Sequence, residues 1–368
     1  MSKDAIIAIT MPKWGLSMQE GKVMEWLAEE GTELKPGDPV MDIETEKIAN
    51  TFEALDAGVL RRKVAQPDDI LPIGALLGVI APANVDDAAI DAFIAEFQAN
   101  YVPPEPEEEE GDGGWDFVEA GGYRLRYAKM GDGTRHIVLV HGFGGDADRW
   151  AFTQEPLAAH ATVWAFDLPG HGQSSKAVRD GSVAALAEVV IAFMDAVGID
   201  RAELVGHSLG GAIALQTAIA HPDRVDALAL IAPAGLGPDI NGDYLAGFVA
   251  CDNRKEMKKL LQELVADPEL VNRALVADML QFKRIDGVPE ALATIAAGFH
   301  DGTRQTLDLR AGLATLGKPV KVIWGSADRI VPASHAASLQ GAEVTVLDGY
   351  GHLVQLEAVA EVNALLGA

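Results

Sequence analysis

The chain has little cysteine, little positive charge and no long apolar run, and each shortage excludes a class of protein. Its single cysteine, Cys251, rules out an internal disulfide and a cysteine-rich zinc site. Its 29 Lys and Arg against 55 Asp and Glu give a net charge of −26, which disfavours nonspecific binding to nucleic acid or an anionic membrane. No apolar run approaches a membrane span, and the first residues lack the pattern of a signal peptide. We therefore expect a cytoplasmic protein with no metal, nucleic acid or membrane partner.

The acidic residues that are present gather between two parts of the chain. Residues 84–116 contain eleven Asp or Glu and no Lys or Arg. Within this stretch, residues 103–114 combine proline, which stiffens the chain, with like charges that extend it and nothing to bury. A chain of 368 residues is long enough for two domains. We predict domains at residues 1–82 and 115–368, joined at residues 83–114 by a short helix and an acidic linker.

The predicted linker helix has an apolar face. Positions 90, 93, 94 and 97 are apolar, which is the period of a helix over residues 86–97, and Asp86 or Asp87 could cap its start. Two interpretations are open. The helix packs on one of the domains, which we favour, or it docks a partner subunit.

An internal repeat organises residues 1–82. Seven residues of the first half recur in the second half at an offset of 37 positions, as Gly21, Leu27, Ala28, Leu34, Gly37, Val40 and Ile43 match Gly58, Val64, Ala65, Leu71, Gly74, Leu77 and Ile80. Short apolar runs alternate with Gly, Pro and Asp turns, which is typical of an all-β fold. Lys47 lies between the two halves. The pattern predicts a small pseudo-symmetric β domain whose central hairpin exposes the Lys47 amine.

Residues 1–82 resemble the lipoyl domains of 2-oxo-acid and acetoin dehydrogenase complexes. Residues 11–18 are similar to the first strand and turn of those domains, and residues 44–48 are similar to their lipoylation hairpin. The resemblance implies that lipoate is attached to Lys47 in amide linkage. Glu46 replaces the usual Asp and keeps its charge, and related biotin-carrying domains have Met on both sides of the lysine, so Glu46 and Ile48 argue against biotin. A long flexible arm can carry an acyl group between distant active sites.

Residues 115–368 alternate strand-like apolar runs with helical segments, which predicts a mostly parallel sheet with helices on both faces. The predicted strands cover residues 123–129, 136–141, 162–167, 202–206, 227–232, 320–324 and 343–347, with helices at 183–197 and 210–220 among them. The helix-rich residues 236–310 interrupt the alternation, and we expect them to form a cap. Apolar side chains of this segment either line an acyl pocket or form ordinary cap core, which we favour for most of them: Met257, Leu260, Leu261, Leu264, Met279 and Phe282.

A Gly-x-Ser-x-Gly motif centred on Ser208 follows one predicted strand and precedes a helix. A strand-to-helix turn this tight leaves no room for side chains beside the serine, which explains the glycines. The glycine-rich residues 141–145 follow another predicted strand. A backbone N–H in this loop, that of Phe143, could join the N–H of Leu209 to form an oxyanion hole.

Two further residues follow the ends of later strands, and they complete the order of a serine triad. Asp328 follows the strand at 320–324, and His352 follows the strand at 343–347. The order Ser208, Asp328, His352 is that of an α/β-hydrolase triad. His171 and His207 are poorer candidates for the base, because His171 belongs to a loop motif and His207 is the variable residue beside the serine.

Residues 115–368 resemble the α/β-hydrolase superfamily through these motifs and through the segment at 167–174. The resemblance implies that Ser208 attacks a carbonyl carbon. His352 would accept and return the serine proton, and Asp328 would hold the imidazole.

A lipoyl domain joined to an α/β-hydrolase domain resembles the dihydrolipoamide acetyltransferase component of acetoin dehydrogenase complexes. None of the nine histidines begins the His-x-x-x-Asp-Gly motif of the usual trimeric acyltransferases, and no peripheral-subunit-binding domain is recognisable. The resemblance implies transfer of an acetyl group from the arm on Lys47 to coenzyme A in an oligomeric complex. Its expected partners are a thiamine-diphosphate-dependent acetoin-cleaving component and a flavin-dependent dihydrolipoamide dehydrogenase.

Two other functions remain open on the sequence. A lipoyl-tethered serine hydrolase would use the same triad to hydrolyse esters, thioesters or carbon–carbon bonds. Alternatively, the lipoyl domain alone would be active and the hydrolase fold would be a scaffold. The intact triad residues argue against this last possibility.

Overall fold

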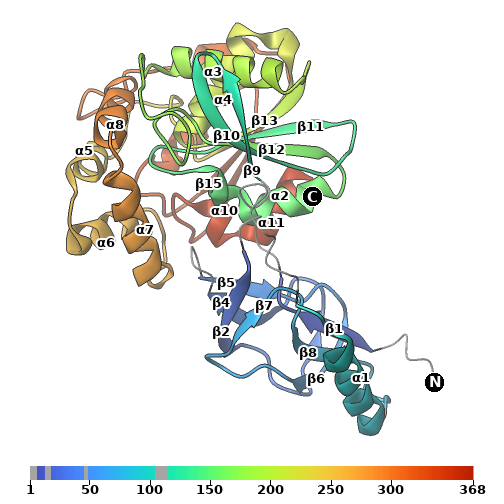
Figure 1. The fold of residues 1–368 in the computed structure, drawn as a ribbon. Helices are drawn as coiled ribbons and strands as arrows, with labels where there is room; N and C mark the ends of the chain where they lie inside the picture. The colour runs from blue at the N-terminus through green and yellow to red at the C-terminus, as the bar shows by residue number, and fades with distance from the viewer. Residues whose placement is uncertain (1–5, 13–17, 45–48, 104–114, 368) are drawn as a thin grey trace. The chain divides into compact units, whose positions relative to one another are not determined.

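The computed structural model describes residues 6–12, 18–44, 49–103 and 115–367, and the chain divides into the compact units Met1–Gly113 and Gly114–Ala368 (Figure 1). Lys47 and most of the predicted acidic linker lie outside the described residues. The elements of the first unit are β1 (Ile7–Thr10), β2 (Glu20–Trp26), β3 (Glu33–Leu34), β4 (Pro39–Glu44), β5 (Ala49–Glu53), β6 (Gly58–Lys63), β7 (Ile70–Pro72), β8 (Leu76–Ala81) and α1 (Asp87–Asn100).

The first unit consists of two four-stranded sheets that carry the sequence repeat. The sheets have the orders β1-β8-β6-β3 and β5-β4-β2-β7. Adding 37 to the numbers of β2, β3 and β4 gives the positions of β6, β7 and β8. The register irregularities recur at the same offset, since one lies at Val23/Glu25 and the other at Leu60/Arg62. The repeat in the sequence is therefore a repeat of strand geometry.

Many of the matched residues of the repeat lie in the core of this unit. Val40 and Leu77, a matched pair, are both fully buried. The carbonyl of Val40 accepts the N–H groups of Leu27 and Ala28, and the carbonyl of Leu77 accepts those of Val64 and Ala65 in the same way. Gly37 and Gly74 both adopt positive φ, of 90° and 78°, which explains why this matched position is glycine.

The strands that flank Lys47 form an antiparallel pair. β4 ends at Glu44, β5 begins at Ala49, and these two residues are opposite each other in the register. The Thr51 hydroxyl on β5 donates to the Asp42 carboxylate on β4 across 2.6 Å. The connecting residues 45–48, with Lys47, lie outside the described residues, but the strands on either side are those of a hairpin.

Helix α1 packs on the first unit through the apolar face predicted from the sequence. Ile90 is fully buried against Leu76 and Val79 of β8, and the partly buried Phe93 and Phe97 pack on the same cluster. Asp86 caps the helix by accepting the Ala88 N–H. Helix α1 therefore packs on the first unit, as the favoured interpretation predicts.

The second unit is built on an eight-stranded sheet of order β16-β15-β14-β13-β11-β12-β10-β9. Its strands are β9 (Trp115–Ala120), β10 (Tyr123–Met130), β11 (His136–Val140), β12 (Thr162–Phe166), β13 (Ala202–His207), β14 (Val225–Ile231), β15 (Val320–Gly325) and β16 (Glu343–Leu347). Adjacent strands from β16 through to β12 pair in parallel. Strand β10 pairs antiparallel with both β12 and β9. The sequence did not indicate β9, an edge strand with few buried residues.

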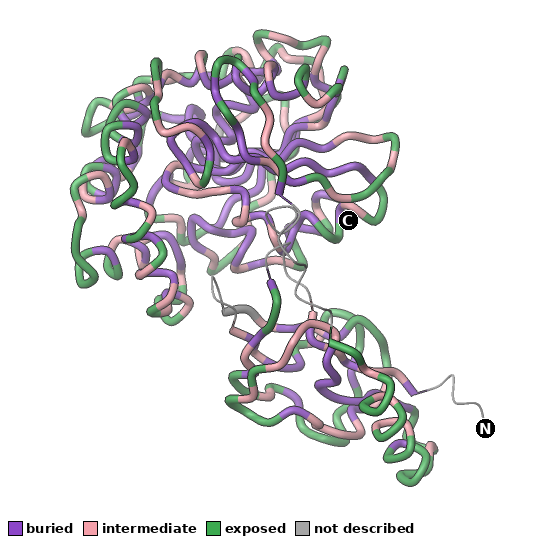
Figure 2. Tube along the Cα trace, in the orientation of Figure 1, coloured by how far each residue is buried: buried purple, intermediate pink, exposed green. Residues whose placement is uncertain are grey.

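Helices cover the sheet and build the predicted cap. The helices of the second unit are α2 (Ala151–Ala158), α3 (Val183–Ala196), α4 (Leu209–Ala220), α5 (Gly242–Ala250), α6 (Arg254–Gln262), α7 (Arg273–Lys283), α8 (Val288–Ala297), α9 (Arg310–Thr315), α10 (Val354–Glu357) and α11 (Val359–Leu366). α3 and α4 pack together, and α2 packs with α11. α5 to α8 gather at one end of the unit (Figure 1). The buried residues form a continuous band along the central strands (Figure 2).

The cap residues singled out in the sequence are mostly interior. Met257 and Leu261 of α6, Leu264, and Met279 of α7 are all below 10% exposed. Most of these side chains therefore form cap core, as the simpler interpretation expects. No helix in the described part of the chain is long and apolar enough to cross a membrane.

The segment at 167–174 turns around a buried ion pair. Both oxygens of the Asp167 carboxylate accept bonds from the Arg126 guanidinium, at 2.6 and 3.1 Å. The Gln173 N–H also donates to Asp167, at 2.8 Å. A Cβ at Gly172 would lie 2.0 Å from the same carboxylate, and its φ is +45°, so only glycine fits. The motif is thus a loop folded onto one carboxylate.

Replacing Arg126 with alanine is expected to destabilise the second unit by about 3–5 kcal/mol, because the buried Asp167 carboxylate would lose its ion-pair partner. Urea unfolding of the full-length chain measures this. Arg201→Ala is the matched control, since its pair with Asp226 is nearly half exposed and is worth at most about 1 kcal/mol. Equal shifts for the two variants would contradict the assignment of a structural role to the buried pair.

Candidate active site

Ser208 occupies a sharp turn between β13 and α4. Its φ of 54° and ψ of −116° are unusual for a residue with a side chain, and such strain is typical of a nucleophile elbow. A Cβ at Gly206 would lie 2.3 Å from the Gly210 carbonyl oxygen, and one at Gly210 would lie 2.1 Å from the Val140 carbonyl oxygen. Both motif glycines are therefore required by close backbone contacts.

The turn lies at the topological switch point of the sheet. β11 and β13 are parallel neighbours, but the chain visits β12 on the other side of β11 before it reaches β13. Ligands of open α/β sheets bind where the strand order reverses, outside the carboxyl ends of the strands. The loop 141–145 follows the carboxyl end of β11, and Ser208 follows the carboxyl end of β13. The topology therefore brings the two motifs together.

Asp328 and His352 are joined by a hydrogen bond of 2.8 Å between the aspartate Oδ2 and the histidine Nδ1. Both side chains are almost completely inaccessible, at 0% and 3% exposed. The other carboxylate oxygen, Oδ1, accepts the N–H groups of Ile330 and Val331 at 2.8 and 3.0 Å. A carboxylate held in this way fixes the tautomer of the ring and leaves Nε2 as the free base.

Ser208 is also buried, with the residue 9% exposed. Among the described residues, its hydroxyl makes no hydrogen bond to the His352 ring. Catalytic hydrogen bonds are often long until substrate binds, so the geometry is compatible with a serine and a base that meet in the bound state. The structure thus joins Asp328 to His352 directly and places Ser208 at the same edge of the sheet.

Two backbone N–H groups are candidates for an oxyanion hole. Leu209 is the first residue of α4, so its N–H has no acceptor within the helix. Phe143 lies in a turn closed by a bond from the Gly145 N–H to the Gly142 carbonyl, at 3.1 Å. A Cβ at Gly142 would lie 3.1 Å from the Cβ of Ser208, which places this loop directly against the elbow. The two predicted donors therefore come from adjacent segments.

Buried histidines hold the loop that contains Phe143. The Gly144 N–H donates to His171 Nε2 at 3.1 Å, and the Leu168 N–H donates to His141 Nε2 at 3.0 Å. Each Nε2 is therefore unprotonated, and each Nδ1–H donates to a backbone carbonyl. Burial lowers the pKa of His141 to about 4 and that of His171 to about 3. Both rings are neutral at pH 7 and serve as fixed acceptors.

His207 has a structural contact that the sequence did not indicate. Its Nε2 lies 2.9 Å from the His352 carbonyl oxygen, and only an Nε2–H can donate to that acceptor. Burial lowers the pKa of His207 well below its usual value, so the ring stays neutral. His207, beside the serine, therefore stabilises the loop that contains His352 through this hydrogen bond. The 145-residue separation of the two partners explains why no local sequence signal identified it.

The cap contacts the oxyanion loop through aromatic rings. The Phe143 ring packs edge-on against Phe248 of α5 and against Phe299, with centroids 5.8 and 6.0 Å apart. The predicted donor residue thus has its side chain anchored in the cap. Displacement of the cap would move this loop.

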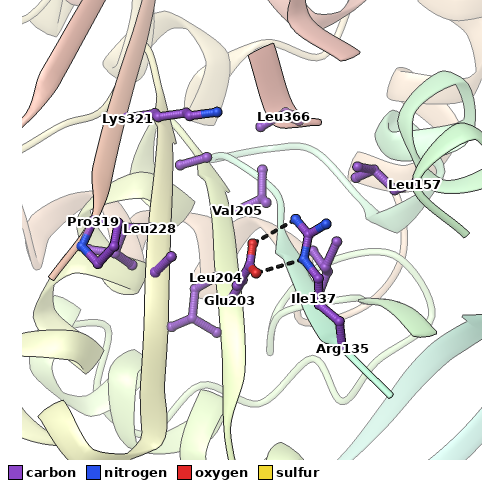
Figure 3. Close-up of a pocket in the computed structure, with 12 residues that line it drawn as sticks. Arg135, Ile137, Leu157, Glu203, Leu204, Val205, Leu228, Pro319, Lys321 and Leu366 are labelled. Atoms are coloured by element: carbon purple, nitrogen blue, oxygen red, sulfur yellow. Dashed lines mark hydrogen bonds and ion pairs between the residues drawn. The ribbon is translucent and has the colours of Figure 1, made fainter. Parts of the chain in front are cut away.

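A small cavity of about 100 Å³ lies at the other edge of the same sheet (Figure 3). Its lining includes Arg135, Glu203 and Lys321, which stand at the beginnings of β11, β13 and β15. Ser208 lies beyond the end of β13, so this cavity is not part of the candidate site. In the described part of the chain, no group of three or more His, Cys, Asp or Glu side chains could hold a metal ion.

Comparison with known proteins agrees with both units. The alpha/beta hydrolase fold family matches residues 135–359, and the family described as biotin-requiring enzyme matches residues 7–80. The solved structure of a meta-cleavage product hydrolase from Pseudomonas fluorescens IP01 is 25% identical, with a TM-score of 0.62 over 68% of this chain and 95% of its own. These matches define the class: an α/β-hydrolase-fold protein with a biotin/lipoyl domain.

Full-length relatives define the family. The dihydrolipoyllysine-residue acetyltransferase component of the acetoin cleaving system of Cupriavidus necator is 48% identical over 98% of this chain and 96% of its own length. The component of the same name from Pseudomonas putida is also 48% identical, over 97% and 96%. The chain belongs to this family of acetyltransferase components, and it is an acyltransferase. The fold class, the family and the enzyme class predicted from the sequence are thereby confirmed.

Proposed function

We propose that this chain transfers an acetyl group from a lipoyl arm on Lys47 to coenzyme A, using Ser208, His352 and Asp328. The proposal is supported by the family, because the relatives from C. necator and P. putida are named for acetyl transfer in an acetoin cleaving system. The observation that carries the mechanism is the 2.8 Å bond between Asp328 Oδ2 and His352 Nδ1, beside a strained serine elbow.

Lipoate fits the position of Lys47. The antiparallel neighbours β4 and β5 are opposite each other at Glu44 and Ala49, so Lys47 belongs to the segment that connects two paired strands. When attached, lipoate provides a thiol that holds the acetyl group as a thioester. The expected partners are a thiamine-diphosphate-dependent component that cleaves acetoin and loads the arm, and a dihydrolipoamide dehydrogenase that reoxidises it, in an oligomeric complex.

In the first half-reaction, the Ser208 hydroxyl attacks the acetyl carbonyl carbon. His352 Nε2 accepts the hydroxyl proton, and Asp328 stabilises the imidazolium that forms. The N–H groups of Phe143 and Leu209 donate to the developing oxyanion. When the carbon–sulfur bond breaks, His352 gives its proton to the departing thiolate, and the acetyl group remains as an ester on Ser208.

In the second half-reaction, His352 accepts the proton of the coenzyme A thiol, and the thiolate attacks the carbonyl carbon of acetylated Ser208. The same two N–H groups stabilise the second oxyanion. The carbon–oxygen bond then breaks, and His352 returns the proton to the Ser208 oxygen. The products are acetyl-CoA and free Ser208, with no oxidant or reductant required.

Hydrolysis of acetylated Ser208 would compete with transfer to coenzyme A, and the similarity of the second unit to a hydrolase supports this second candidate function. The second unit has the fold of a meta-cleavage product hydrolase at 25% identity. Water in place of the coenzyme A thiol would convert the second half-reaction into release of acetate. Transfer therefore requires the cap to exclude water or to position coenzyme A near acetylated Ser208.

Product analysis of the full-length chain, lipoylated and acetylated on its arm, tests the proposal. We expect acetyl-CoA to be the main product when coenzyme A is present, and little acetate when it is absent. A chain with an unacetylated arm provides the background. Acetate that forms at the same rate with and without coenzyme A would contradict the transferase function and establish a tethered hydrolase.

A further inference from the structure

Glu357, the last residue of α10, bridges the catalytic histidine loop and the cap. Its Oε2 accepts the N–H of Gly351, the residue directly before His352, at 2.7 Å. Its Oε1 accepts the N–H of Ala266, in the cap segment after α6, at 2.6 Å. One carboxylate thus satisfies a donor from each of two segments that are far apart in the sequence.

Other bonds join the same two regions. The Leu353 N–H, directly after His352, donates to the Leu264 carbonyl at 3.0 Å. Arg329, directly after Asp328, donates from Nη2 to the carbonyls of Gln262, at 2.7 Å, and Val265. The cap segment at 262–266 is therefore bound to the loops that contain both Asp328 and His352.

Gly351 contacts the cap segment and Glu357 too closely to be replaced by a residue with a side chain. A Cβ at Gly351 would lie 2.7 Å from the Ala266 nitrogen and 2.8 Å from Glu357 Oε2. Burial raises the pKa of Glu357, opposed by the N–H groups that donate to it, and nearby Asp267 raises it further. The buried carboxylate is stable here because both of its oxygens are used as acceptors.

We propose that Glu357 is a positioning residue that fixes the cap segment 262–266 against the His352 loop, so that the base is placed for transfer and water is kept from acetylated Ser208. The inference rests on the proposed transfer reaction. Glutamine cannot replace this carboxylate, because its amide has one acceptor oxygen and its NH₂ would face an N–H donor. Glu357→Gln therefore breaks one side of the bridge and leaves the volume nearly unchanged.

The test compares Glu357→Gln with Glu361→Gln in the full-length, arm-acetylated chain. Glu361 is an exposed acid on α11 whose carboxylate accepts the Tyr350 hydroxyl at 3.2 Å, so the control makes the same chemical change nearby. We expect Glu357→Gln to lower kcat for acetyl-CoA formation by about 10- to 100-fold, because a displacement near 1 Å is enough for such losses. The KM for coenzyme A should change little, and the share of acetate should rise several-fold.

The share of acetate separates positioning from simple destabilisation, since a partly unfolded sample lowers both products alike. If Glu357→Gln does not fold, Arg329→Gln removes another bond to the same segment from a half-exposed side chain and should also raise the acetate share. The inference would be overturned if the folded variants gave the wild-type ratio of acetate to acetyl-CoA and if Glu357→Gln had the same kcat as Glu361→Gln.

Acylation by p-nitrophenyl acetate distinguishes this failure from failure of the proposed function. Wild type that forms no Ser208-dependent acetyl-enzyme and no acetyl-CoA would contradict the proposed reaction itself. Wild type that forms both, while Glu357→Gln matches its control, would contradict only the role of Glu357.

Discussion

Acetyl-CoA formation should fall by on the order of 10⁴-fold or more when Ser208 is replaced by alanine. The variant removes the nucleophile that would accept the acetyl group, and no other described hydroxyl occupies the elbow at the end of β13. Initial rates with arm-acetylated chain and coenzyme A measure the loss. The hydroxyl is small, so the fold and the attachment of lipoate should be unaffected.

The matched control for this variant is Ser334→Ala, at an exposed serine of the same unit, which should keep full activity. Mass spectrometry of wild type quenched without coenzyme A should find the acetyl group on a peptide that contains Ser208. Undiminished transfer by Ser208→Ala would show that coenzyme A attacks the arm thioester directly, and the hydrolase unit would then be a scaffold.

Replacing Lys47 with arginine should abolish acetyl transfer within the chain. Arginine keeps the positive charge but cannot take lipoate in amide linkage, so the mass increase of lipoylation should disappear and no acetyl group should be loaded. Intact-mass measurement after expression with a lipoate-attaching enzyme, followed by the transfer assay, tests both consequences. The second unit should still react with p-nitrophenyl acetate, because Ser208 is untouched.

Lys35→Arg is the control for this variant, since Lys35 is an exposed lysine of the first unit near a turn. It should be lipoylated and fully active. Lipoylation that persists in Lys47→Arg would assign the arm to another lysine and would refute the interpretation of the repeat as a frame for Lys47.

Much of the fold was predictable because its signals are local. The repeat at an offset of 37 predicted the similar strands in the two halves of the first unit, because similar residues recur at corresponding positions. In the second unit, continuous apolar runs marked buried strands such as β11 and β12. Edge strand β9 was missed because only its two end residues, Trp115 and Ala120, are buried, so it lacks such a run.

The residues that position the predicted triad and oxyanion loop were much harder to predict than the triad itself. His207 and His171 were set aside as bases, and the structure shows instead that His207 contacts the His352 carbonyl and that His171 accepts the Gly144 N–H. Glu357 gave no sequence signal at all. A supporting side chain is identified by what it touches, and its partners lie in segments distant in the chain.

The sequence by itself determined the class and the family, and it predicted the residues that would carry the chemistry: Lys47, Ser208, Asp328 and His352. These follow from short motifs, since a tight turn or a strand end constrains its own neighbouring residues. Only the tertiary structure decided how closely Asp328 and His352 meet, and that His141 and His171 are buried as neutral acceptors. These contacts depend on the parallel strand order, which places the carboxyl ends of β11, β13, β15 and β16 on the same side of the sheet, and strand order is set by long-range packing.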